Sequence, residues 1–259
     1  MDWIIFVLAP ILGFLTGIIN TISGSGSLLT LPFFIFAGLP ATVANGTNRL
    51  GILGQSSIST VVLRKQFSQH SPSPWVVIVP AVIASGFGAY TASLTDPDVL
   101  KGITGLLLIL LIGPVMSNSQ KWLRPANESG DYKRKPLLVF LFVLIGFYGG
   151  FIQAGAGIFM LAALVLIGGC SLKHANLLKN LTTLCFNIPA FAIFLWQGQV
   201  SWLIGLTMMS GQIVGAWIAA KFISDNPQAN IWTRYLLIIM LLVSAAKLIW
   251  DFLNEMQWL

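Results

Sequence analysis

Two stretches of the sequence carry polar side chains inside otherwise apolar runs, and each contains one cation. The stretches are ATVANGTNRLGILGQSSISTVVL at 41–63 and HANLLKNLTTLCFNIPAFAIFLW at 174–196, and the cations are Arg49 and Lys179. Each cation lies near the second turn of its predicted helix, where a charge costs roughly 2.5–3.5 kcal/mol inside a membrane. No Asp or Glu lies in the interior of any apolar run. A buried cation without a carboxylate partner indicates water or an anionic ligand; the alternative is that both long side chains reach an interface.

The remaining reactive side chains argue against an enzyme. The chain has two histidines and two cysteines, and the spacing of Cys170, His174 and Cys185 matches no known set of metal ligands. Both cysteines fall in apolar segments, which favours a role in packing, with a redox relay as the alternative. The sequence therefore predicts no catalytic residue, no metal site and no cofactor.

Composition places these residues in a membrane protein. The 259 residues are 56% hydrophobic and 8% charged, whereas about a quarter of a soluble domain is charged. Runs near the length that spans a bilayer recur along the whole chain, which predicts an all-α polytopic membrane protein. We expect the net charge of +6 to reflect membrane topology rather than nucleic-acid binding. The ten apolar segments are 3–22, 27–39, 42–63, 75–94, 99–117, 137–154, 157–169, 174–196, 201–221 and 232–252.

Two of these segments are short and follow glycine-rich breaks. Segments 27–39 and 157–169 would each span about 20 Å as helices, less than a hydrocarbon core of about 30 Å. Non-helical backbone at membrane depth survives only where it lines a polar cavity or is buried in protein. The helix that begins after such a break directs free N–H groups towards the cavity and favours an anion. The alternative is that the glycines only permit close helix packing.

The two halves of the chain resemble each other. GFLTG at 13–17 matches GFYGG at 146–150, GSG at 24–26 matches GAG at 155–157, and AN at 44–45 matches AN at 175–176. GFGAYTAS at 86–93 also matches QIVGAWIAA at 212–220. We therefore predict a first transmembrane repeat over 1–117, a linker over 118–136 and a second transmembrane repeat over 137–259, with about five helical elements in each repeat.

The distribution of basic residues predicts that the repeats are inverted. Arg64 and Lys65 follow the third segment, whereas the equivalent place in the second half, WQGQVSW, carries no charge. Lys221 and Arg234 instead lie at the place equivalent to LTDPDV in the first half. The rule that basic loops stay inside then places the 118–136 linker in the cytoplasm and both termini outside. Whether 3–39 and 137–169 cross the membrane twice or form re-entrant hairpins stays open.

Inverted repeats with broken helices are the plan of many secondary transporters, whose substrates bind where the repeats meet. The sequence therefore predicts a substrate site at the two breaks and on the polar faces of the segments that follow them. The candidate residues are Asn20, Ser23, Gly24, Ser25, Gly26, Ser27, Asn45, Thr47, Asn48, Arg49, Gln153, Gly155, Ala156, Gly157, Asn176, Lys179, Asn180 and Thr183.

In the order of these motifs the chain resembles the TauE/SafE family of bacterial membrane permeases, also called sulfite exporters. The resemblance rests on GSGS at 24–27, LP at 31–32, GLP at 38–40, ANGTN at 44–48, GQVSW at 198–202 and GQIVGAWIAAKF at 211–222. It implies passage of small sulfur-containing anions: sulfite, sulfoacetate, thiosulfate or an organosulfonate. The chain has less glycine than is usual at ISGSGS, and it has Asn48 and Arg49 where many members have small or hydroxyl residues. The second departure suggests Arg49 as a determinant of specificity.

We therefore expect a permease of the inner membrane that exports a small anion and has the lipid bilayer and its substrate as partners. Because His174 is the only titratable side chain near the predicted spans that suits proton coupling, we expect export to follow the membrane potential without a coupling ion. A passive anion channel is the nearest alternative. A membrane-embedded enzyme or a scaffold subunit would not explain polar residues repeated in both halves.

Overall fold

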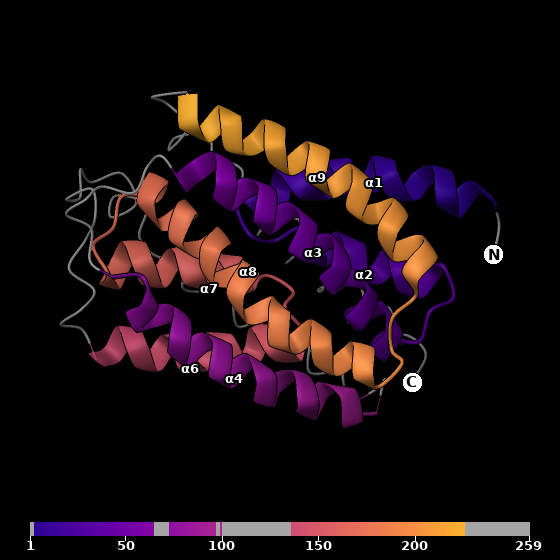
Figure 1. Ribbon diagram of the computed structural model, residues 1–259, viewed down its shortest axis with the longest axis horizontal. Helices are drawn as coiled ribbons and strands as arrows, with labels where there is room; N and C mark the ends of the chain where they lie inside the picture. The colour runs from indigo at the N-terminus through magenta and orange to yellow at the C-terminus, as the bar shows by residue number, and fades with distance from the viewer. Residues whose placement is uncertain (1–2, 65–72, 97–98, 100–135, 226–259) are drawn as a thin grey trace, which may run out of the picture.

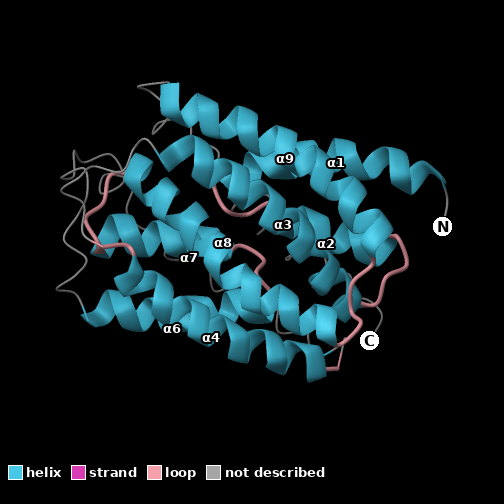
Figure 2. Cartoon of the chain, viewed as in Figure 1, coloured by secondary structure: helices cyan, strands magenta, loops and turns pink. Residues whose placement is uncertain are grey.

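The structure is a computed structural model that describes residues 3–64, 73–96, 99 and 136–225. Every regular element in this part of the chain is a helix, as Figure 2 shows. The predicted segments at 99–117 and 232–252 and the predicted linker lie outside the described residues, apart from Val99 and Pro136. The helices are α1 (Trp3–Ile22), α2 (Ser27–Phe36), α3 (Ala41–Leu63), α4 (Trp75–Leu94), α6 (Pro136–Phe151), α7 (Ala156–Ala162), the π-helix η2 (Ala163–Ile167), α8 (Leu172–Trp196) and α9 (Trp202–Asp225).

Both predicted breaks are present. The helix α1 ends at Ile22 and α2 begins at Ser27, and the helix α6 ends at Phe151 and α7 begins at Ala156. The sequence placed the end of the sixth segment at residue 154, three residues too late, because Ile152 and Ala154 are apolar and extend the run. Residues 152–155 leave the helix because Gln153 and Gly155 both adopt a positive φ, which an α-helix does not allow.

Four helices within the described residues are long and apolar enough to cross a membrane, namely Trp3–Ile22, Trp75–Leu94, Leu172–Trp196 and Trp202–Ile223. Their outer faces carry large exposed apolar side chains, for example Ile11 of α1 and Phe87 of α4. The helix α3 is long enough but too polar to satisfy the same criterion, and most of its polar residues are buried inside the protein. This distribution, apolar outside and polar inside, is that of an all-α, multi-pass membrane protein.

The helices form two outer pairs around a central pair. Figure 1 shows α1 and α9 along one side, α4 and α6 along the opposite side, and α3 and α8 between them. The central helices contact each other, and α3 also packs against α9 as α8 packs against α4. The shorter α2 and α7 lie inside this frame, where they continue the chain after the two breaks.

Small residues allow the outer pairs to approach closely. A Cβ atom at Gly13 of α1 would collide with the backbone of Met208 in α9, and one at Gly146 of α6 would collide with the backbone of Ala81 in α4. The repeat match aligns these two contacts. Gly13 corresponds to Gly146, and Met208 corresponds to Ala81 because they lie seven residues before Gly215 and Gly88, which the match aligns. A duplicated unit produces such paired contacts, and the inversion of the two repeats stays a prediction.

Candidate functional site

Lys179, near the start of α8, binds the end of α1. Its Nζ donates hydrogen bonds to the carbonyl oxygens of Asn20 (3.0 Å) and Thr21 (2.6 Å) and to Oδ1 of Asn176 (2.8 Å). The last carbonyl groups of a helix lack donors within that helix and carry its negative dipole end. The ammonium group supplies both donors and charge there. Because Lys179 is only 1% exposed, its side chain does not reach a membrane interface.

Arg49 of α3 makes the corresponding contacts with the end of α6. Its guanidinium donates to the carbonyl oxygens of Gly149 (3.2 Å) and Gly150, and to side-chain oxygens of Asn45 (3.4 Å), Gln153 (3.3 Å) and Asn187 (3.1 Å). The guanidinium also lies 4.9 Å from the centre of the Phe194 ring, within the range of a cation–π contact. Arg49 is fully buried.

Each cation therefore belongs to one half of the chain and binds the broken helix of the other half. Water, an anionic ligand and a membrane interface are the partners that the sequence suggests for these cations. Backbone carbonyl groups are a further class, which becomes available only because the breaks leave helix ends inside the protein. Both cations thus stabilise the contact between the two halves of the chain.

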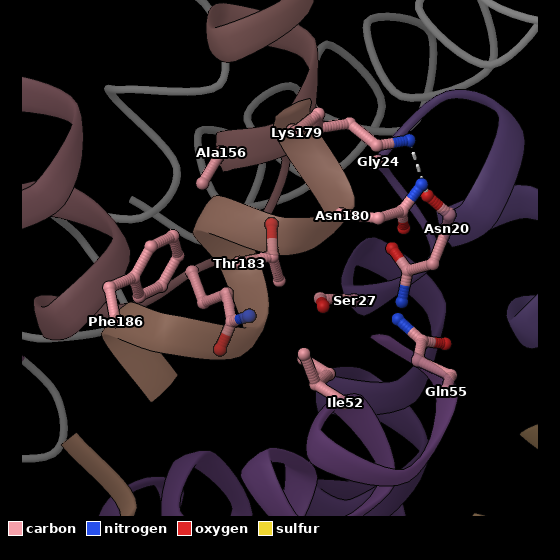
Figure 3. Close-up of a pocket in the computed structure, with 12 residues that line it drawn as sticks. Asn20, Gly24, Ser27, Ile52, Gln55, Ala156, Lys179, Asn180, Thr183 and Phe186 are labelled. Atoms are coloured by element: carbon pink, nitrogen blue, oxygen red, sulfur yellow. Dashed lines mark hydrogen bonds between the residues drawn. The ribbon is translucent and has the colours of Figure 1, made fainter. Parts of the chain in front are cut away.

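A small cavity of about 20 Å³ lies between the two breaks, and Figure 3 shows the side chains around it. The α2 helix begins at Ser27 and the α7 helix begins at Ala156, and both residues line this cavity. The predicted convergence of the two helix starts is therefore observed. The lining residues are Asn20, Gly24, Ser27, Ile52, Gln55, Gln153, Ala156, Gly157, Lys179, Asn180, Thr183 and Phe186.

The amide of Asn20 presents hydrogen-bond donors to the cavity. Its Oδ1 accepts a hydrogen bond from the backbone N–H of Gly26 at 2.6 Å, which assigns the oxygen end of the amide because a backbone N–H only donates. The Nδ2 atom is buried and has no partner among the described residues. Because buried polar groups in proteins are nearly always paired, an unpaired N–H₂ group beside a cavity indicates a site for an acceptor.

The cavity brings together half of the candidate residues that the sequence named. These are Asn20, Gly24, Ser27, Gln153, Ala156, Gly157, Lys179, Asn180 and Thr183. The other half are buried but lie outside the lining: Ser23, Ser25, Gly26, Asn45, Thr47, Asn48, Arg49, Gly155 and Asn176.

Several of the residues outside the lining have partners that fix the breaks and the central helices. The hydroxyl groups of Ser23 and Ser25 bind each other at 2.6 Å. The Asn48 Oδ1 accepts from Thr30 at 2.6 Å, and the Thr47 hydroxyl accepts from the N–H of Ser201 at 2.9 Å. These contacts give the residues a structural role in the described conformation.

Three lining residues are absent from the sequence-based set: Ile52, Gln55 and Phe186. The repeat match carries the signal for the first of them. When AN at 44–45 is aligned with AN at 175–176, Ile52 corresponds to Thr183 and Gln55 corresponds to Phe186. Extending each candidate to its repeat partner would have found Ile52 from Thr183. Only the folded chain shows that the next turn of both helices also reaches the cavity.

The two breaks also touch each other beside the cavity. A Cβ atom on Gly157 would overlap the backbone of Gly24, and one on Gly24 would overlap the backbone of Gly157. Gly24 has a φ of +79°, a conformation that side chains other than glycine rarely adopt. These glycines therefore permit both the turn and the direct contact between the two halves.

The described residues contain no group of three or more His, Cys, Asp or Glu side chains that would hold a metal ion. Within the cavity lining, Lys179 is the charged residue and the other polar side chains are amides and hydroxyls. The lining therefore offers hydrogen-bond donors from one ammonium group, several amides and two hydroxyl groups.

The family model described as "Sulfite exporter TauE/SafE" matches residues 9–248 of the chain. The chain belongs to the sulfite exporter TauE/SafE family. The resemblance noted in the sequence is confirmed, and the match includes both breaks and every residue of the cavity lining. Membership supports a membrane transporter.

Three curated relatives agree over nearly their whole length. The chain is 29% identical to a "Probable membrane transporter protein" of Haemophilus influenzae, with 92% of each chain covered. It is 30% identical to "Probable membrane transporter protein ORF9" of a Sinorhizobium species, over 92% of this chain and 90% of the relative. It is 28% identical to "Probable membrane transporter protein YfcA" of Escherichia coli K12, over 95% and 93%. No solved structure matches the chain.

Proposed function

We propose that this TauE/SafE protein is an inner-membrane permease that exports a small sulfur-containing anion through the cavity between the two breaks. The observation that carries the proposal is the combination of Lys179 and the unpaired Asn20 N–H₂ group at one cavity. The first supplies positive charge and the second supplies a donor for an oxygen acceptor. Together they form a small set of polar groups that suits an oxyanion.

The charge of the lining supports an anion rather than a cation as substrate. The Nζ of Lys179 donates to three oxygen atoms, as an ammonium group does, and the described lining residues include no Asp or Glu. Arg49 is outside the lining, but it donates a hydrogen bond to Gln153, which is part of the lining. A cation entering the cavity would meet repulsion from both side chains with nothing to balance it, whereas an anion would offset a charge that is costly to bury.

The family name supports a sulfur oxyanion. Sulfite, thiosulfate, sulfoacetate and organosulfonates each carry a negatively charged head with two or more oxygen acceptors, which matches donors contributed by both halves of the chain. A cavity of about 20 Å³ has room for about one water-sized particle. A bound oxyanion therefore requires the lining side chains to move apart, as expected for a carrier that alternates between closed and open forms.

The proposed direction is outward, with the 118–136 linker in the cytoplasm and both termini outside. An inside-negative membrane potential drives an anion out of the cell without a coupling ion. The paired contacts of α1 with α9 and of α6 with α4 support two repeats of one unit, and the swap of basic loops supports their inversion.

Ligand binding to the purified protein tests the proposal. Binding of sulfite, thiosulfate, sulfoacetate and chloride is measured for the wild type, Lys179→Gln and Lys221→Gln. Lys221 is the matched control, because it lies exposed on α9, with its Nζ 5.5 Å from the centre of the Trp217 ring. We expect a sulfur oxyanion to bind the wild type and the Lys221 variant, and to bind Lys179→Gln about tenfold or more weakly.

Flux into proteoliposomes completes the test. Saturable flux that responds to membrane potential supports a carrier, and an ohmic current instead indicates a channel. If no sulfur oxyanion binds, or if Lys179→Gln binds it as well as the wild type does, the proposed substrate class and site are wrong.

A further inference from the structure

Gln153 has an unusual backbone. Its φ is +67°, and it is the non-glycine residue in the described part of the chain with a positive φ. The residue lies in the break between α6 and α7, is 4% exposed and lines the cavity. Glycine adopts this conformation without strain, whereas other residues do so at a cost in free energy. In the repeat match Gly24 corresponds to Gly155, which is also a glycine with a positive φ, so Gln153 is an additional residue of this conformation in the second break.

The position is therefore occupied by a side chain that its backbone does not favour. Residues held in such conformations cluster at binding sites, where surrounding contacts maintain them. Here the N–H of Gln153 donates to the carbonyl of Tyr148 at 3.3 Å, and Arg49 holds the side chain. The question is what the amide of Gln153 contributes that glycine would not.

Arg49 determines which end of that amide faces the cavity. Its Nη1 donates to Oε1 of Gln153 at 3.3 Å. A guanidinium only donates hydrogen bonds, so the oxygen of the amide must be the end that faces Arg49. The Nε2 end is then directed away from Arg49, and none of the described residues accepts a hydrogen bond from it. The Asn20 amide has the same arrangement, with its oxygen bound to a backbone N–H and its nitrogen unpaired.

We propose that Gln153 is a specificity-determining residue of the cavity and that Arg49 is a positioning residue that orients its N–H₂ group towards the ligand. This inference rests on the proposed function and deepens it. Asn20 lies in the last turn of α1, just before the first break, and Gln153 lies in the second break, so together they offer donors from both halves of the chain. An anion with several oxygens can place a separate acceptor at each donor, whereas a monatomic halide must serve both donors from one atom, so the pair favours a polyatomic oxyanion.

The proposal differs from the direct role for Arg49 that the sequence suggested. Arg49 lies outside the cavity lining, and its contacts are with the end of α6 and with side chains of both halves. It acts on the ligand through Gln153. Lys179, which does line the cavity, supplies the nearer charge.

Three variants of Gln153 separate a ligand contact from a structural role. Gln153→Met keeps the length of the side chain and removes the donor, Gln153→Glu replaces the donor with an oxygen, and Gln153→Gly removes the side chain and suits the positive φ. The readouts are the dissociation constants for thiosulfate and for chloride, together with the thermal unfolding temperature of the purified protein. Gln212→Met is the matched control, because Gln212 is a fully buried glutamine outside the cavity.

We expect Gln153→Met and Gln153→Gly to weaken thiosulfate binding about tenfold or more, with a change of less than about threefold for chloride. Gln153→Glu should weaken thiosulfate binding further, because it adds a negative charge. Gln153→Gly should unfold at or above the wild-type temperature, because glycine relieves the backbone. Gln212→Met should retain the wild-type ratio of the two dissociation constants.

A double-mutant cycle tests the role of Arg49. Arg49→Lys keeps the charge but loses the fork that reaches both α6 and Gln153. We expect Arg49→Lys to reduce the preference for thiosulfate over chloride in the wild-type background and to have no further effect on that ratio in the Gln153→Met background. A purely structural role for Arg49 would change stability equally in both backgrounds without moving the ratio.

The outcomes separate this inference from the proposed function. If the wild type binds thiosulfate and Gln153→Met and Gln153→Gly bind it equally well, the role of Gln153 is overturned while the permease proposal stands. If Arg49→Lys lowers the ratio equally in both backgrounds, the positioning role of Arg49 is overturned. If the wild type binds no sulfur oxyanion, the proposed function fails, and the inference fails with it.

Discussion

Gly24 lies in the break of the first half and is in direct backbone contact with Gly157, which lies in the first turn of α7, just after the break of the second half. The contact joins the two breaks at the wall of the cavity that both residues line. In the permease proposed above, opening of this cavity would separate the two glycines, so we expect this contact to matter for transport as well as for packing.

Adding one methyl group at this contact should impair both folding and transport. Because a Cβ on Gly157 would overlap the backbone of Gly24, we expect Gly157→Ala to lower the free energy of unfolding by about 1–3 kcal/mol, the usual cost of overpacking. Flux of the proposed substrate into proteoliposomes should also fall. Thermal unfolding in detergent and a flux assay with matched protein amounts measure the two effects.

Gly86→Ala is the control for that substitution. Gly86 also lies in a helix, but nothing lies within 4 Å of the position that its Cβ would occupy. We expect this variant to be as stable as the wild type or more stable by up to about 1 kcal/mol, because alanine favours the helix. Equal stability of Gly157→Ala and Gly86→Ala would show that the contact between the breaks is not tightly packed.

Arg49 should tolerate replacement by the other basic residue less well than Lys179 does. Arg49 donates to five acceptors, whereas Lys179 donates to three, which is the number that an ammonium group can serve. Arg49→Lys therefore leaves some of these oxygens unpaired, and we expect a loss of about 1–3 kcal/mol of stability. Chemical or thermal unfolding of the purified variant measures this loss.

Lys221→Arg is the control, because it also replaces one basic residue with another, but on the exposed face of α9. Its stability should stay within about 0.5 kcal/mol of the wild type, as for most surface substitutions. A stability of Arg49→Lys equal to that of Lys221→Arg would mean that the contacts between Arg49 and the end of α6 contribute nothing to folding.

The sequence predicted the long helices well, because the apolar runs at 3–22 and 75–94 have the same bounds as α1 and α4. It also placed the breaks, because glycine and serine interrupt the hydrophobic pattern there. It did not predict the partners of Arg49 and Lys179. Those partners are backbone carbonyl groups at the ends of helices from the opposite half, and residue types carry no information about them.

The same limit explains why only half of the candidate residues line the cavity. Asn48 and Gln55 are both polar and buried in α3, yet Gln55 lines the cavity while Asn48 binds Thr30 of α2. Polarity predicts that a residue faces the interior of a membrane protein. Which neighbour it meets depends on how α3 and α8 cross, and the spacing along one helix does not determine that crossing.

The hydroxyl group of Ser27 should contribute to ligand binding. Ser27 begins α2, lines the cavity and is 2% exposed, and no described residue pairs with its hydroxyl group. We expect Ser27→Ala to raise the dissociation constant for the sulfur oxyanion about three- to tenfold, the range for one hydrogen bond. Equilibrium binding to the purified variant measures this change.

Ser57→Ala is the matched control, because Ser57 is exposed on α3 and its hydroxyl donates to the carbonyl of Leu53 at 2.7 Å. Its dissociation constant should equal that of the wild type. Should both serine variants bind as the wild type does, the first turn of α2 would not be part of the binding site.

Gln55→Glu tests the sign of the charge that the cavity accepts. Gln55 is 4% exposed and lines the same cavity as Lys179, so the substitution places a carboxylate beside the ammonium group with almost no change in shape. The carboxylate would offset the charge of Lys179 and repel an incoming anion, and we expect an about ten- to hundredfold loss of oxyanion affinity at neutral pH, on the scale of charged hydrogen bonds. Gln197→Glu makes the same change at an exposed position after α8 and should bind normally. Oxyanion binding by Gln55→Glu at wild-type affinity would place the anion elsewhere in the protein.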